Sequence, residues 1–100
     1  MTSKRERLPY RRGAEAIVFE HGGRRWRACF GLFGDGRLAE LFLDAGRESP
    51  IAEAARESAL LASLALQHGS PEDTLRHALD GRDAGPLATA LAAITEARNG

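Results

Sequence analysis

Residues 14–43 read AEAIVFEHGGRRWRACFGLFGDGRLAELFL, and this stretch decides the fold. Three short runs in it are separated by Gly22-Gly23 and by Gly34-Asp35-Gly36. Gly-Gly and Asp-Gly pairs tolerate the positive φ angles that tight hairpin turns require. The stretch therefore predicts a three-stranded antiparallel meander.

The two turns predict one consistent strand register. A two-residue Gly-Gly loop in the first turn places Phe19 opposite Trp26, and a two-residue Asp-Gly loop in the second places Phe30 opposite Leu41. Because side chains alternate between the faces of a strand, a slip of one residue would scatter the apolar set that both hairpins place on one face. We expect that face to form the core. It carries Ile17, Phe19, Trp26, Ala28, Phe30, Leu32, Leu41 and Leu43.

The opposite face carries an apolar patch that a solvated sheet does not need. The same Asp-Gly loop places Leu32 opposite Ala39 on the first face, and Phe33 opposite Leu38 on this second one. The N-terminal arm, the last helix or a second subunit are the alternatives for covering the patch. We name four residues as a candidate partner or oligomer interface: Cys29, Phe33, Leu38 and Phe42.

After Asp44 the apolar spacing becomes helical. Ser49-Pro50 is a helix start with proline at the first position, and that helix is predicted to reach about His68 and to stop at Gly69. Ser70-Pro71 repeats the start signal, with Asp73 placed for a capping box and an end near Leu79. A third helix is predicted from about Pro86 to Arg98. The expected architecture is α+β, with a meander followed by three helices packed on one of its faces (β-β-β-α-α-α).

Composition sets the class of protein. The chain has 100 residues, 43% of them hydrophobic, and fourteen basic side chains balance fourteen acidic ones, so one globular domain is expected at residues 14–100 after a flexible basic arm at residues 1–13. The longest apolar stretch, residues 59–66, is too short to cross a bilayer, and the charged N-terminus does not read as a signal peptide. The single cysteine cannot form a disulfide within the chain, which is consistent with a reducing compartment. We therefore expect a cytoplasmic protein with no membrane partner.

No catalytic constellation emerges from the sequence. His21, His68 and His77 lack metal-ligand partners at helical spacing, and Cys29 reads as a small packed hydrophobe. The glycine-rich run at residues 31–36 leads into a strand, so it predicts a hairpin turn and not a phosphate loop. We therefore assign no catalytic, cofactor-binding or metal-binding residue.

Charge is unevenly distributed, which leaves nucleic-acid or nucleotide binding as an alternative function. Residues 1–27 hold eight basic side chains and three acidic ones. Thirteen of the fourteen basic residues are arginine, a bias that a GC-rich genome also produces. The polyanion-binding candidates in the arm and the second strand are Arg11, Arg12, Arg24, Arg25 and Arg27.

The segment GDGRLAELFL, from Gly34 to Leu43, resembles the Asp-Gly turn and the Glu-containing strand of the TSCPD domain family. The resemblance continues through Gly46, the helix ending SLALQHG and the Ser-Pro helix, and it spans roughly residues 12–86. TSCPD domains are best known as C-terminal modules of adenosylcobalamin-dependent ribonucleotide reductases, and they also occur as small stand-alone proteins. The resemblance implies a link to ribonucleotide reduction.

The chain departs from this family where a Thr-Ser-Cys-Pro-Asp segment is expected after the second helix. Residues 81–87 read GRDAGPL, without cysteine, so neither a redox role nor a catalytic residue carries over. The resemblance therefore implies a stand-alone TSCPD-like domain with no cofactor and no catalytic activity of its own. Such a domain is expected to act by protein association, as a homodimer or with a ribonucleotide reductase subunit.

Overall fold

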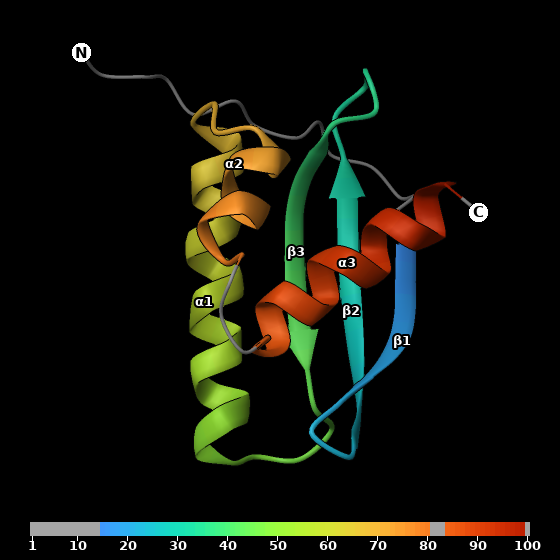
Figure 1. Cartoon of the computed structure of the whole chain (residues 1–100), viewed down its shortest axis with the longest axis vertical. Coiled ribbons are helices and arrows are strands. Elements are labelled where there is room, and N and C mark those ends of the chain that lie inside the picture. The colour runs from blue at the N-terminus through green and yellow to red at the C-terminus, as the bar shows by residue number, and fades with distance from the viewer. Residues whose placement is uncertain (1–14, 81–83, 100) are drawn as a thin grey trace.

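The two glycine turns fold the first half of the chain into the expected antiparallel meander, with strand order β1-β2-β3 (Figure 1). The strands are β1 Glu15–His21, β2 Arg24–Leu32 and β3 Leu38–Asp44 in a computed structural model that describes residues 15–80 and 84–99. Gly22 and Gly23 have φ angles of 64° and 73°, the pair of positive angles that a two-residue type I′ turn needs. The basic arm predicted at residues 1–13 lies outside the described residues, and the domain boundary at residue 14 stays a prediction.

The predicted register is confirmed over most of the sheet. Phe19 lies opposite Trp26, and Phe30 lies opposite Leu41. We call the face that carries these four residues the inner face, and the opposite one the outer face. The inner face holds most of the largest buried side chains of the sheet, so the alternation of apolar and polar residues located the core correctly.

The register next to the second turn was predicted wrongly. Leu32 pairs with Leu38 and not with Ala39, because the loop has three residues instead of two. The Phe33 N–H donates to the carbonyl of Arg37 at 2.8 Å, and Gly36 closes the loop with a φ of 93°. A three-residue loop of this kind ends in a residue with positive φ, and Ala39 is then an extra residue that restores the predicted pairing further along.

Three helices follow the sheet, as predicted: α1 Pro50–Gln67, α2 Glu72–Ala78 and α3 Pro86–Asn99. The Ser49 hydroxyl caps α1 by accepting from the N–H of Ala52 at 3.1 Å. The capping box predicted at Ser70 and Asp73 is wrong, since α2 has no side-chain cap. Instead, Ser70 closes α1, because its N–H donates to the carbonyl of Ala65 at 3.0 Å in a C-terminal motif around Gly69.

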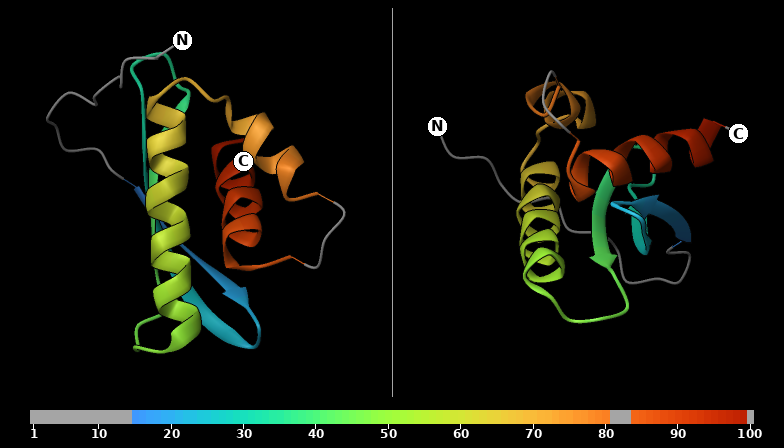
Figure 2. Two further views of the ribbon diagram at one scale, coloured as in Figure 1. Left: turned by 90° about the vertical axis from the view of Figure 1, so that its left-hand side faces the viewer. Right: turned by 60° about the horizontal axis from the view of Figure 1, so that its bottom comes forward.

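The core lies between the inner face, α1 and α3. Helix α3 crosses the inner face, and α1 runs alongside β3, as Figures 1 and 2 show together. Alanines on α1 allow it to approach closely, while Leu91 and Ile94 of α3 are fully buried. Helix α2 buries none of its residues completely, so the fold depends mainly on the other two helices.

Helix α1 also closes the free edge of β3. The Ser63 hydroxyl accepts from the N–H of Leu41 at 2.9 Å and donates to the carbonyl of the same residue at 3.0 Å. The Gln67 amide donates to the carbonyl of Ala39 at 3.2 Å. Both polar side chains are buried, and they take the place of a fourth strand.

Candidate functional site

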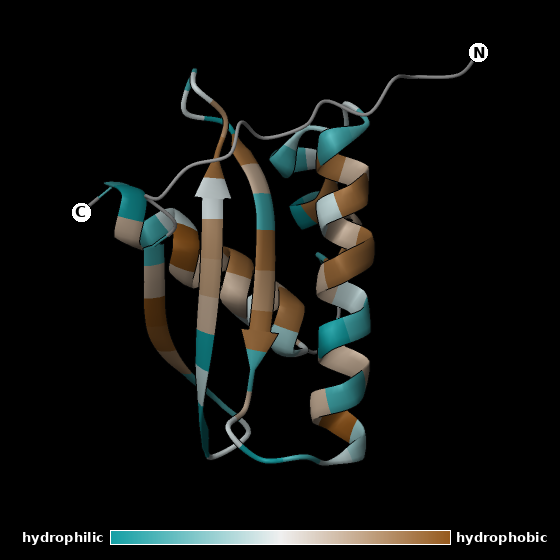
Figure 3. Cartoon of the chain, turned by 180° about the vertical axis from the view of Figure 1, so that it is seen from behind, coloured by the Kyte–Doolittle hydropathy of each residue, from teal (hydrophilic) through white to brown (hydrophobic). Residues whose placement is uncertain are grey.

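The outer face of the sheet is the candidate interaction surface. Ala16, Cys29 and Phe42 lie in one row across the three strands, and Val18, Arg27 and Asp44 form the next row. Phe42 is 49% exposed and Val18 is 61% exposed. None of the described helices covers this face, which Figure 3 shows from behind. An apolar centre between charged rows is the usual arrangement of a protein–protein interface.

The structure separates the four residues that the sequence grouped into one interface. Cys29 and Phe42 are cross-strand partners on the outer face, where Cys29 is partly buried. Phe33 and Leu38 are instead buried, and Leu38 belongs to the core. The three-residue loop is the cause, since it removes their direct pairing, and the Phe33 ring packs under the guanidinium of Arg37 at 4.5 Å. Ala16 and Val18 of β1 therefore replace Phe33 and Leu38 in the candidate surface.

The structure also separates the five arginines that the sequence suggested as polyanion-binding candidates. Arg11 and Arg12 lie outside the described residues. Arg27 is exposed on the outer face beside Val18, whereas Arg24 and Arg25 line a shallow hollow at the end of the sheet near the first turn. The hollow also contains Arg47, which no sequence motif indicates, because this residue follows β3 and is far from the other two arginines in the chain.

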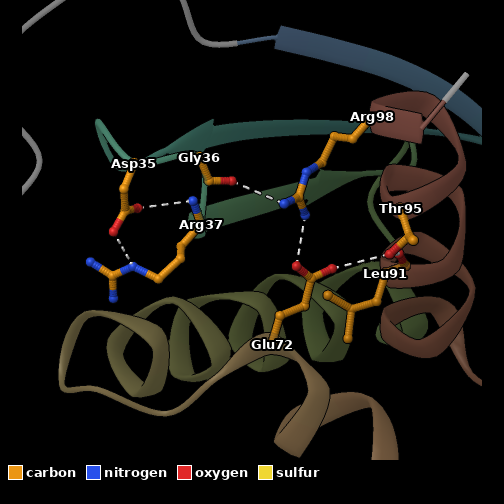
Figure 4. A network of polar contacts seen from close by, with 7 residues as sticks. All are labelled: Asp35, Gly36, Arg37, Glu72, Leu91, Thr95 and Arg98. Carbon is orange, nitrogen blue, oxygen red and sulfur yellow. Dashed lines mark hydrogen bonds and ion pairs between the residues drawn. The ribbon is translucent and has the colours of Figure 1, made fainter.

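A polar network at the other end of the sheet ties three distant segments together (Figure 4). Glu72 at the start of α2 binds Arg98 near the end of α3, with 2.7 Å between Oε1 and Nη1. Arg98 also donates to the carbonyl of Gly36 at 3.0 Å, and the Thr95 hydroxyl lies 3.1 Å from the other Glu72 oxygen. Each charged group in this network has a partner, so the arrangement is structural and offers no free group for chemistry.

Asp35 stabilises the three-residue loop at this end. Its carboxylate accepts from the backbone N–H of Arg37 at 3.1 Å and from Arg37 Nε at 2.7 Å. These hydrogen bonds, that of the backbone first, hold the pKa of the Asp35 carboxyl below its usual value. Since the carboxylate is engaged within the loop, it is a turn-stabilising group and not an acid or base for a substrate.

The histidines serve no common site. The Nδ1 atom of His21 lies 3.1 Å from the Thr89 hydroxyl and links β1 to α3. His68 is exposed at the C-cap of α1, and His77 is exposed on α2. Across residues 15–80 and 84–99, no three His, Cys, Asp or Glu side chains gather closely enough to hold a metal ion. In the same part of the chain, no helix combines the length and apolarity needed to cross a bilayer.

The chain is thus a small α+β module in which no helix of the described residues covers one face of the sheet. No set of catalytic side chains is brought together among these residues. Over 72 residues, the chain is 36% identical to the vitamin B12-dependent ribonucleotide reductase of Agrobacterium fabrum, a match that covers 71% of this chain. The match covers only 6% of that reductase, so the chain is similar to a small part of a much larger protein. No protein-family model and no solved structure matches the chain.

Proposed function

We propose that this chain is a non-catalytic, TSCPD-like module that associates with a ribonucleotide reductase. The observation that carries the proposal is the 36% identity over 72 residues to a vitamin B12-dependent ribonucleotide reductase. A segment that accounts for 6% of such a relative is far too small to perform the reaction of the whole protein, so its role is accessory. The TSCPD resemblance of residues 34–43 agrees with this assignment.

The outer face is the surface that we assign to the partner. Phe42 and Val18 supply an exposed apolar centre, and Arg27 and Asp44 supply charges beside it. Association through this face would bury the side chains of Phe42 and Val18, and such burial of apolar surface is the main driving force of protein–protein binding. Self-association through the same face is the competing outcome.

Co-purification from the native host tests the proposal. The tagged chain is recovered with and without nuclease, beside the Phe42→Glu and Leu61→Glu variants. Leu61 is the matched control, because it is 66% exposed and lies on α1 rather than on the sheet. If the proposal is right, a reductase subunit is recovered with the tagged chain, and nuclease does not reduce its recovery. The subunit is also recovered with Leu61→Glu, but it is not recovered with Phe42→Glu. If no reductase subunit is enriched, the proposal is wrong.

Light scattering of the purified chain separates the two kinds of partner. Under the proposal, the wild-type chain and Phe42→Glu are both monomers. A wild-type dimer that Phe42→Glu converts to a monomer would assign the outer face to self-association instead. Circular dichroism checks that the variant remains folded, as expected for a half-exposed position.

A further inference from the structure

The first turn and the loop after β3 meet at the same end of the sheet (Figure 1). Between them lies a hollow of about 400 Å³. Three arginine side chains from two separate segments line it, together with two glycines and one alanine: Gly23, Arg24, Arg25, Ala45, Gly46 and Arg47. Neither the outer face nor the proposed reductase partner accounts for this concentration of positive charge.

These three arginines differ from the arginines that stabilise the fold. Arg37, Arg56 and Arg98 each bind a carboxylate at 2.7–3.0 Å. Within the part of the chain that the structure describes, Arg24, Arg25 and Arg47 bind none. The Nη1 atom of Arg24 is moreover shielded from solvent and has no hydrogen-bond partner among residues 15–80 and 84–99. A buried cationic nitrogen without a partner is costly, so an anion that reached this atom would stabilise it.

Three carboxylates lie close in sequence or across the strand pair to the hollow, and one of them, Glu48, is paired with another arginine. Glu48 holds both terminal nitrogens of Arg56, at 3.0 and 3.2 Å. Asp44 accepts from the N–H of Gly46 at 2.8 Å. Glu20 lies opposite Arg25 across the hairpin, but no ion pair joins the two within the described residues. Among the described residues, no carboxylate therefore forms an ion pair with the three arginines, and Asp44 is held at Gly46 of the hollow by the backbone.

We propose that this hollow binds a di- or triphosphate group. Guanidinium groups match phosphate oxygens as paired donors, and three of them suit an anion that carries several charges. Gly23 and Gly46 leave the backbone open, since a Cβ atom at either position would meet nothing within 4 Å. Among the described residues, the lining contains no aromatic side chain on which a base could stack, so the site is expected to recognise the phosphates and to be indifferent to the base.

Calorimetric titration of the purified chain with sodium tripolyphosphate at about 50 mM salt tests the proposal. We expect saturable binding at one site, with affinity that falls at about 200 mM salt. Arg47→Gln should weaken it about tenfold, the usual effect of losing one charge-assisted hydrogen bond. Arg76→Gln, which removes an exposed charge on α2, is the matched control and should change the dissociation constant less than about twofold.

Competition between ATP and tripolyphosphate shows whether a nucleotide can supply the phosphate group. NMR spectra of the backbone amides locate the binding site. ATP should displace tripolyphosphate with similar affinity, and the amide signals of Gly23 and Gly46 should shift on binding. Absence of saturable binding, or equal weakening by Arg47→Gln and Arg76→Gln, would overturn the proposal. Binding of a single-stranded oligonucleotide that tripolyphosphate does not displace would also overturn it in favour of nucleic acid. None of these results depends on a reductase, so they test the hollow separately from the proposed function.

Discussion

The two faces of one sheet each carry a phenylalanine, and the two rings have different surroundings. Phe30 and Phe42 lie on neighbouring strands, yet Phe30 is 1% exposed on the inner face and Phe42 is 49% exposed on the outer face. Helices α1 and α3 pack against the inner side, and none of the described helices packs against the outer one (Figures 1 and 3). The face with the continuous apolar alternation therefore forms the core, and Phe42 stays half-exposed on the outer face among charged residues.

Replacing the two phenylalanines by alanine gives the largest expected difference between the faces. Phe30→Ala should lower the free energy of unfolding by about 3–5 kcal/mol, because it leaves a cavity in the core. Phe42→Ala should cost about 1 kcal/mol or less, since its side chain is half in water already. Urea unfolding of both variants measures the two values. Equal losses would mean that the outer face is also covered.

The second largest effect on stability is expected for the hydroxyl of Ser63, which bonds to the edge strand β3. Ser63→Ala should lower the free energy of unfolding by about 2 kcal/mol, because the N–H and carbonyl of Leu41 lose their partner in a buried position. Ser58→Ala is the control on the same helix, where the hydroxyl bonds only to the carbonyl of Ala55, and its change should stay within about 0.5 kcal/mol. A Ser63 variant as stable as the Ser58 variant would contradict the edge-closing role of α1.

The ion pair between Glu72 and Arg98 is expected to matter less than Ser63. Its side chains are 17% and 25% exposed, so Glu72→Gln should cost about 1 kcal/mol, and part of that loss should disappear in high salt. Glu53→Gln on the exposed side of α1 serves as the control. Chemical denaturation at two salt concentrations measures both variants. A loss as large as that of Phe30→Ala would show that the network, and not the inner face, dominates stability.

The smallest effect on stability is expected from Asp35. The direction of its pH dependence follows from the lowered pKa of its carboxyl. The two hydrogen bonds from Arg37 favour the ionised carboxylate in the folded chain, so their stabilisation is present above the ordinary pKa of aspartate and is lost as the pH falls through the lowered value. An NMR titration of the Asp35 carboxyl should show the lowered pKa. Arg37→Gln should raise it toward the ordinary value, and an unchanged pKa in this variant would contradict the assignment.

Local signals in the sequence were sufficient for the elements of this fold. The Gly22-Gly23 turn and the Ser49-Pro50 helix start act through a few adjacent residues, and both are present as predicted. The three-residue loop was missed because Gly-Asp-Gly fits a two-residue loop as well, and only the pairing of Phe33 with Arg37 distinguishes the two. Local reasoning therefore succeeded at Gly22-Gly23 and Ser49-Pro50 and failed at two other local motifs, the second turn and the capping box expected at Ser70 and Asp73.

The candidate site was predicted less completely than the fold, because it depends on contacts between residues that are distant in the sequence. Phe42 was placed on the outer face correctly by alternation, whereas Leu38 was misplaced by the loop error. The bonds from Ser63 to Leu41 and the approach of Arg47 to Arg25 depend on how separate segments pack, and neither has a motif in the sequence.

The most direct test of the account is the binding of this chain to the purified ribonucleotide reductase subunit of the same host. Sedimentation velocity at matched concentrations compares the wild-type chain with Phe42→Glu and Leu61→Glu. The account predicts a complex with the wild-type chain and with Leu61→Glu, and a dissociation constant raised at least about tenfold by Phe42→Glu. A complex that Phe42→Glu leaves intact, or no complex with the wild-type chain, would contradict it.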